Sequence, residues 1–89
     1  MLKITTTHAG TKVTLRLEGR LVGPWVDEFR KALDECHDAT VTVDLSNTTF
    51  VDGYGRRVLA DARAHGAQVV TAGPLMEALV AQEEHGHGN

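Results

Sequence analysis

The sequence lacks the residues on which several classes of protein depend. It has one cysteine, Cys36, in 89 residues, so no internal disulfide can form, and a reducing compartment fits this composition. No apolar run approaches the roughly 18–20 residues that a membrane span needs. The first residues also lack the apolar stretch of a signal peptide. We therefore expect a cytoplasmic domain that does not insert into a membrane.

Aromatic and basic residues are also scarce. Aromatic side chains make up 4% of the chain, so the core has to be built from Val, Leu, Ala and Ile. The 9 Lys and Arg residues are outnumbered by 12 Asp and Glu, which gives a formal net charge of −3. Nucleic-acid-binding domains usually have a basic footprint, so this balance argues against a nucleic-acid partner. What is present, 42% hydrophobic residues in a short chain, fits one small globular domain.

Two alternating segments open the chain. Residues 2–7 alternate loosely, and residues 12–18 alternate cleanly, with apolar side chains at Val13, Leu15 and Leu17. Between the segments lies Gly10, a residue that can adopt a positive φ in a turn. The pattern predicts an antiparallel β-hairpin.

The hydrophobic period changes after residue 23. Pro24 suits the first turn of a helix, where its missing N–H is harmless. The apolar residues that follow have helical spacing, and acidic residues dominate the remaining positions. This arrangement predicts an amphipathic helix packed on one side. Its inward residues are predicted to be Trp25, Val26, Phe29, Ala32, Leu33 and Cys36.

The following segment predicts a strand, a loop and a second helix. Residues 40–45 alternate as a strand, whereas the polar residues 46–49 are typical of a loop. Phe50 and Val51 are two adjacent apolar residues after this loop. Asp52 is then a suitable N-cap for a helix over residues 53–65.

A short strand and a last helix complete the predicted domain. Residues 67–72 include two adjacent valines, and Gly73-Pro74 precedes a helix with inward Leu75, Met76, Leu79 and Val80. We expect a domain over residues 1–81 and a flexible polar tail over 82–89. The order β-β-α-β-α-β-α predicts a single small α/β domain, in which helices pack against a four-stranded mixed sheet.

Residues 41–55 resemble the STAS domain family, the anti-sigma-factor antagonists and their relatives. In that family a strand ending in Asp-Leu-Ser leads through a short loop to Phe-Ile-Asp-Ser-Ser-Gly-Leu-Gly, which opens a helix. Asp44-Leu45-Ser46, Phe50-Val51-Asp52 and Gly55 match this pattern. Residues 17–21 also resemble the family's second strand and the turn that leaves it. The resemblance extends over about residues 2–80.

The resemblance implies a non-catalytic protein-interaction module in bacterial regulation. Its implied partner is an anti-sigma factor or another ATPase-fold regulator. The family's phosphorylatable serine falls at Tyr54, so we predict that Ser phosphorylation does not switch this domain. The resemblance also leaves open an accessory subunit that binds an ABC-transporter ATPase. Family members usually continue with a strand and a helix after the position of Val80, so we also hypothesise a homodimer with Leu75 and Leu79 near the contact.

The predicted helix start after residue 51 is the main candidate site. Free N–H groups and the helix dipole favour an anion there, and the glycines let the backbone approach a ligand. Three interpretations stay open: a capped helix start, a partner-docking loop, and a sensor site for a nucleotide or another anion. The pattern leaves the exposure of Tyr54 undecided. The residues concerned are Asp52, Gly53, Tyr54, Gly55, Arg56 and Arg57.

A strip of arginines and small residues follows on the same predicted helix. Arg56, Arg57 and Arg63 flank Ala60 and Ala64, all predicted to lie opposite the apolar face. Such a flat basic strip either accepts a partner helix that carries carboxylates or is simply solvated.

No catalytic or metal-binding constellation emerges from the sequence. The five histidines are joined by no cysteine or carboxylate cluster at ligand spacing, so we predict no metal and no cofactor. Asp44 and Asp52 end a strand and start a helix, and paired carboxylates can do acid–base work. The family resemblance instead implies structural caps at both positions. We therefore expect a protein that is not an enzyme.

Overall fold

The computed structural model describes residues 1–71 and 73, and these residues form the predicted hairpin followed by alternating helices and strands. The last predicted helix, with Leu75 and Leu79, and the predicted tail lie outside the described residues. The elements are β1 (Leu2–Ala9), β2 (Lys12–Leu21), α1 (Pro24–Asp34), β3 (Thr40–Val51), α2 (Gly53–Ala64) and β4 (Gln68–Thr71).

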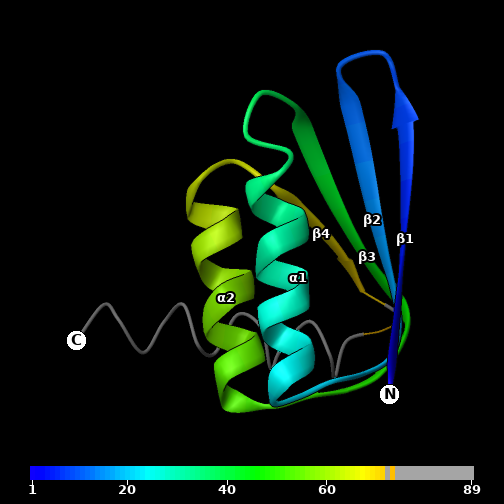
Figure 1. The fold of residues 1–89 in the computed structure, drawn as a ribbon, viewed down its shortest axis with the longest axis vertical. Helices are drawn as coiled ribbons and strands as arrows, with labels where there is room; N and C mark the ends of the chain where they lie inside the picture. The colour runs from blue at the N-terminus through cyan, green and yellow to red at the C-terminus, as the bar shows by residue number, and fades with distance from the viewer. Residues whose placement is uncertain (72, 74–89) are drawn as a thin grey trace.

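The four strands form one mixed sheet in the order β1-β2-β3-β4. The β1–β2 pair is antiparallel, with Gly10 at φ 65° in the turn, and both pairs that involve β3 are parallel. Figure 1 shows α1 and α2 side by side on the same side of this sheet. The ends of β2 and β3 therefore lie at the same end of the molecule as the starts of both helices. The predicted α/β fold is confirmed for these elements.

The core lies in the single layer between the sheet and the two helices. Strand β2 alternates as predicted, with buried Val13, Leu15 and Leu17 facing the helices. The residues between them lie on the other face, where the side chain of Arg16 is 3.8 Å from that of Glu18. Phe29 is the one aromatic side chain in this core, so aliphatic residues fill most of it, as the composition predicts.

Strand β3 is longer than its polar sequence suggests. The predicted loop over residues 46–49 is wrong, because β3 continues from Thr40 to Val51. It pairs with the second half of β2 through two register shifts, one of them between Gly19 and Arg20. The hydroxyls of Thr48 and Thr49 donate to the carbonyls of Leu17 and Gly19, at 2.8 Å and 3.1 Å. These cross-strand bonds hold the irregular part of the ladder, and β-branched threonine suits a strand.

Helix α1 differs from its prediction at both ends. Trp25 stands in the first turn and is 36% exposed, so its predicted inward position is wrong. The helix ends at Asp34, before Cys36. Cys36 is nevertheless buried, and its thiol donates to the carbonyl of Ala32 at 3.2 Å. Burial, with the nearby Glu35 carboxylate as a smaller cause, raises the pKa of this thiol and so disfavours a reactive thiolate.

Candidate functional site

The Asp52 carboxylate joins the two loops from which α1 and α2 begin. One oxygen, Oδ1, accepts from the backbone N–H of Gly55 at 2.7 Å, which caps α2. The other, Oδ2, accepts from the backbone N–H of Gly23 at 2.9 Å, just before α1. The backbone N–H of Asp52 also donates to the carbonyl of Leu21, at 3.2 Å. The predicted N-cap is confirmed, and it also fixes the loop between β2 and α1.

The two glycines of this segment have different roles. A Cβ added at Gly55 would lie 2.9 Å from a methyl carbon of Val51 and 3.0 Å from the carbonyl oxygen of Leu21. At Gly53 an added Cβ would meet only the end of the Arg56 side chain, at 3.8 Å. Only Gly55 is therefore required by close packing, because α2 begins directly against the ends of β2 and β3.

Tyr54 presents part of its ring to solvent while its polar end is held. The side chain is 37% exposed, and its hydroxyl donates to the carboxylate of Asp27 at 2.9 Å. The guanidinium carbon of Arg30 lies over the same ring, 5.2 Å from its centroid. Both contacts link α2 to α1. The ring is thus held at the surface, as a cation–π contact of this geometry favours.

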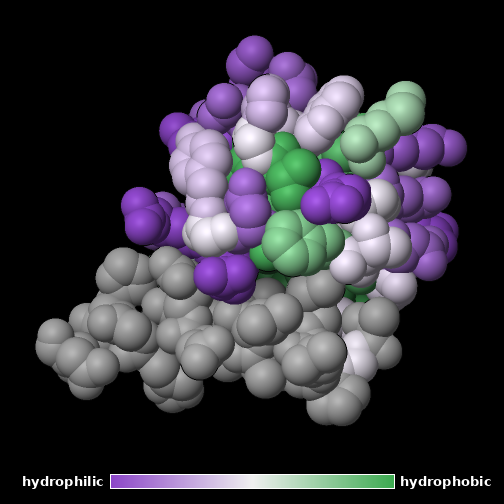
Figure 2. All heavy atoms as spheres, turned by 90° about the horizontal axis from the view of Figure 1, so that it is seen from below, coloured by the Kyte–Doolittle hydropathy of each residue, from purple (hydrophilic) through white to green (hydrophobic). Residues whose placement is uncertain are grey.

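Three of the four aromatic residues are exposed, and all three stand where the helices begin. Trp25 opens α1, Phe50 is 48% exposed near the end of β3, and Tyr54 opens α2. The guanidinium carbon of Arg20 lies 5.2 Å from the centroid of the Phe50 ring. Figure 2 shows this end of the molecule, where a few apolar residues are visible among hydrophilic ones. We call Trp25, Phe50 and Tyr54 the aromatic end.

The aromatic end was not predicted, although the sequence carries a signal for part of it. Side chains alternate between the two faces of a strand, so Phe50 must point away from the core if its neighbour Val51 points into it. Val51 is buried in the core, which places Phe50 on the opposite face. The exposure of Trp25 had no such signal, because its helical phase is compatible with the core.

The predicted arginine strip does not form one surface. Ala60 is only 8% exposed, so its predicted outward position is wrong. One turn earlier, Arg56 is half-buried and its guanidinium donates to the carbonyl of Val51, at 3.3 Å. This flank of α2 therefore turns toward the sheet. Arg63 is half-buried, whereas Arg57 is exposed on another side of the helix.

The remaining candidates have structural roles. Asp44 and Asp52 are separated by seven further residues of extended β3, roughly 25 Å, so they do not form an acid–base pair. The side chain of Asp44 accepts from the backbone N–H of Ser46, and hydrogen bonding by Ser46 lowers the pKa of this carboxyl. Within residues 1–71 and 73, no three His, Cys, Asp or Glu side chains group as metal ligands. None of the described helices is long and apolar enough to cross a membrane.

Removing the Asp52 side chain is expected to destabilise the domain. Asp52→Ala loses both the α2 cap and the bond to Gly23, which predicts a loss of about 1–3 kcal/mol in the free energy of unfolding. Asp52→Asn keeps an oxygen for Gly55 but offers no second acceptor to Gly23, so a smaller loss is expected. Urea denaturation of both variants measures the effect. Equal stability of Asp52→Ala and the wild type would contradict the role of this carboxylate.

A family model described as "Mlab, STAS domain" matches residues 4–84. The chain belongs to the STAS domain family. The resemblance seen at residues 41–55 is thereby confirmed over most of the chain. A comparison with curated proteins finds no match.

Solved structures agree with this assignment. The STAS domain of an antisigma-factor antagonist from Rhodobacter sphaeroides is 28% identical, with a TM-score of 0.61, over 81% of this chain and 86% of that one. The anti-sigma factor antagonist SpoIIAA in its unphosphorylated form has a TM-score of 0.72 at 15% identity, over 89% of this chain and 80% of that one, which shows the shared fold. Mglu is 25% identical, with a TM-score of 0.63, over 79% of this chain. This STAS domain spans only 19% of the length of Mglu.

Proposed function

We propose that this STAS domain is a non-catalytic docking module that binds a protein partner through the aromatic end. The observation that carries the proposal is the exposure of Trp25, Phe50 and Tyr54 at the end where both helices begin. Exposed aromatic side chains grouped on one surface are typical of interface anchors, because they offer a large contact area at low entropic cost. The proposed partner is an ATPase-fold anti-sigma factor, in keeping with the similarity to an antisigma-factor antagonist domain.

The contacts around the aromatic end support docking with little rearrangement. Asp52 ties the two loops together, and the Tyr54 hydroxyl is bound to Asp27 on the neighbouring helix. A surface held in this way loses little conformational freedom when a partner binds, which favours affinity. The same contacts argue against the anion-sensor alternative, because the Asp52 carboxylate already occupies the start of α2. A bound anion would have to displace it or lie beside its negative charge.

The proposed docking is not controlled by serine phosphorylation. Tyr54 stands at the family's phosphoserine position, and Gly53 precedes it. The nearest hydroxyls in β3, those of Thr48 and Thr49, donate to backbone carbonyls of β2. After incubation with an ATPase-fold anti-sigma factor that has kinase activity and ATP, we expect mass spectrometry to find no phosphate on residues 46–54. Tyr54→Ser serves as the matched variant that restores a target hydroxyl. Stoichiometric phosphorylation of the wild-type segment would contradict the prediction.

A second partner class is the ATPase of an ABC transporter. The match to the family model described as "Mlab, STAS domain", together with tyrosine at the switch position, favours a partner that is held without a phosphorylation cycle. Calorimetric titration of the purified domain against an ATPase-fold anti-sigma factor and against a transporter ATPase of the same organism separates the two. Binding to one of them identifies the partner class. Failure to bind either would contradict docking to an ATPase.

A further inference from the structure

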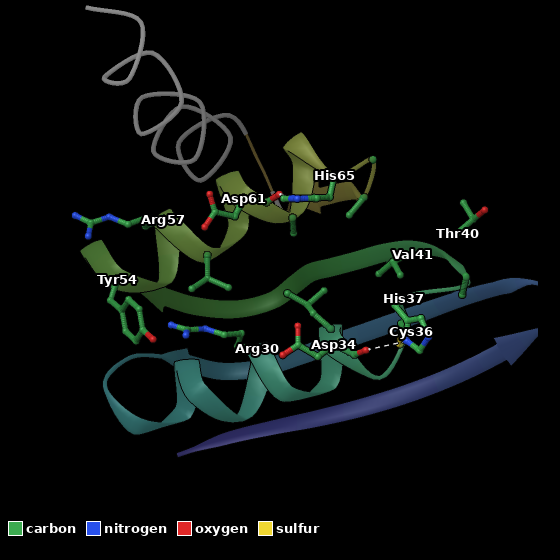
Figure 3. A pocket seen from close by; sticks show the side chains of 16 residues that line it. Arg30, Asp34, Cys36, His37, Thr40, Val41, Tyr54, Arg57, Asp61 and His65 are labelled. Atoms are coloured by element: carbon green, nitrogen blue, oxygen red, sulfur yellow. Dashed lines mark hydrogen bonds between the residues drawn. The ribbon is translucent and has the colours of Figure 1, made fainter.

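A groove with a volume of about 780 Å³ runs between the outer surfaces of α1 and α2. Its floor is apolar, with the half-buried Leu33 and Val41 and the buried Val58 packed on or within the core. Charged side chains form its two walls, as Figure 3 shows. The groove therefore combines an apolar floor with charged rims from the second half of α1 and from most of α2.

The two walls present charge in the same order. On α1, Arg30 is followed one turn later by Asp34, and on α2, Arg57 is followed one turn later by Asp61. Figure 3 places the two arginines near Tyr54 at one end of the groove and the two aspartates farther along it. This order arises because α1 and α2 run in the same direction. The groove thus has a positive section beside the aromatic end and a negative section beyond it.

Among the described residues, Asp34 and Asp61 have no side-chain partner, whereas several other acids of the domain do. Asp27, Asp44 and Asp52 each accept a hydrogen bond through their side chains. Within the described part of the chain, the carboxylates of Asp34 and Asp61 make neither a hydrogen bond nor an ion pair. Both line the groove, one from each wall. A cation held in this section of the groove would therefore face carboxylates that have no existing hydrogen bond or ion pair to lose.

We propose that this groove receives one helix of the protein partner. The helix lays its apolar face on the floor, places a Lys or Arg between Asp34 and Asp61, and places an acid one turn away beside Arg30. The inference rests on the proposed docking function and specifies the partner's chemistry. Because Tyr54 belongs to both the groove and the aromatic end, the two surfaces are continuous.

The shape of the groove favours a helix over a small molecule. The α2 wall extends from Tyr54 to Ala62, roughly 12 Å, which matches about two turns of a partner helix. Amphipathic helices bind grooves in this way, with apolar anchors spaced over successive turns. Along each wall the charge changes from positive to negative within one turn. A partner helix that carries an acid and a base one turn apart on one face would match this change.

The test uses a panel of synthetic 15-residue helical peptides and the intact domain. Each peptide carries Leu on one face, together with a Glu and an Arg four positions apart, in either order. A matched peptide replaces the Arg by Glu. Binding is measured by titration of backbone amide NMR signals in the wild type, in Asp34→Lys/Asp61→Lys, and in Glu28→Lys/Glu35→Lys. The last variant makes the same charge change at exposed positions of α1 and its C-cap that do not line the groove. Circular dichroism confirms that each variant is folded.

We expect a Glu/Arg peptide to bind the wild type saturably and to shift signals of α1 and α2 along the groove. Asp34→Lys/Asp61→Lys should weaken its binding at least tenfold and should bind the all-Glu peptide instead. Glu28→Lys/Glu35→Lys should bind within about twofold of the wild type. The proposal is overturned if no peptide binds, if the two double variants bind alike, or if a nucleotide rather than a peptide saturates the groove.

A further variant separates this proposal from the docking function. Phe50 does not line the groove, so Phe50→Ala should leave peptide binding within about twofold of the wild type. Under the proposed function the same change weakens binding of the whole partner. The groove proposal alone would be overturned by one combination of results. In it, Phe50→Ala weakens binding of the whole partner, whereas Asp34→Lys/Asp61→Lys leaves the affinity for the peptide unchanged. Peptide binding with no effect of Phe50→Ala on the partner would instead overturn docking through the aromatic end.

Discussion

Alanine in place of Gly55 is expected to destabilise the domain by about 1–3 kcal/mol, the range seen when atoms are forced into a packed core. Its Cβ would lie 2.9 Å from Val51 and 3.0 Å from the carbonyl oxygen of Leu21. The second contact is with backbone, so it cannot be relieved by a change of rotamer. Helix propensity alone predicts the opposite sign, a gain of about 0.5–1 kcal/mol. Urea denaturation measures the change in the free energy of unfolding. The sign of this change tests whether α2 closely approaches the ends of the strands.

Gly53→Ala is the matched control for this prediction. Its Cβ would meet only the flexible end of Arg56, at 3.8 Å, so the variant should be as stable as the wild type or slightly more stable. If both variants gained stability, the packing of the helix start described above would be wrong. If both variants lost the same amount of stability, the loss would arise from the segment as a whole and not from the contact at Gly55.

Loss of an exposed aromatic ring is expected to have the largest effect on partner binding. Trp25→Ala and Phe50→Ala should each weaken the affinity about 30-fold or more, the range of interface hot spots. Both side chains are partly exposed, so the free energy of unfolding should change by less than about 1 kcal/mol. Calorimetric titration gives the affinities, and urea denaturation of the free variants gives the stabilities.

Val70→Ala is the control for the aromatic variants. Val70 is an exposed apolar residue too, but it lies on β4 and not where the helices begin. Its replacement should leave the partner affinity within about twofold of the wild type. An affinity loss in Val70→Ala equal to that in Phe50→Ala would move the docking surface to the sheet.

The elements with a clean local signal were predictable. Alternation in β2 and the glycine between the strands define the hairpin, since both act through neighbouring residues. The Asp52 cap was predictable for the same reason, because the acceptor and the Gly55 N–H lie within one turn. Its second bond, to Gly23, joins residues far apart in the sequence, so only the folded arrangement shows it.

The errors have a common physical cause, which is tertiary contact. Residues 46–49 look like a loop by composition, yet Thr48 and Thr49 are held in β3 by carbonyls of β2. Ala60 looks exposed by helical phase, yet its flank of α2 turns toward the sheet. The groove could not be predicted either. It depends on how two helices lie beside each other, and no pattern within one helix sets that placement.

The most direct test of docking through the aromatic end is a hydrogen-exchange footprint of the domain with and without its ATPase-fold partner. Amides at the starts of α1 and α2 and at the end of β3, residues 22–30 and 49–58, should exchange more slowly in the complex. Amides of the second half of β1, residues 6–9, should exchange at unchanged rates, because they pair with the start of β2 at the opposite end of the sheet. Protection confined to β1 and the outer face of the sheet, with no change around Trp25, Phe50 and Tyr54, would contradict the account.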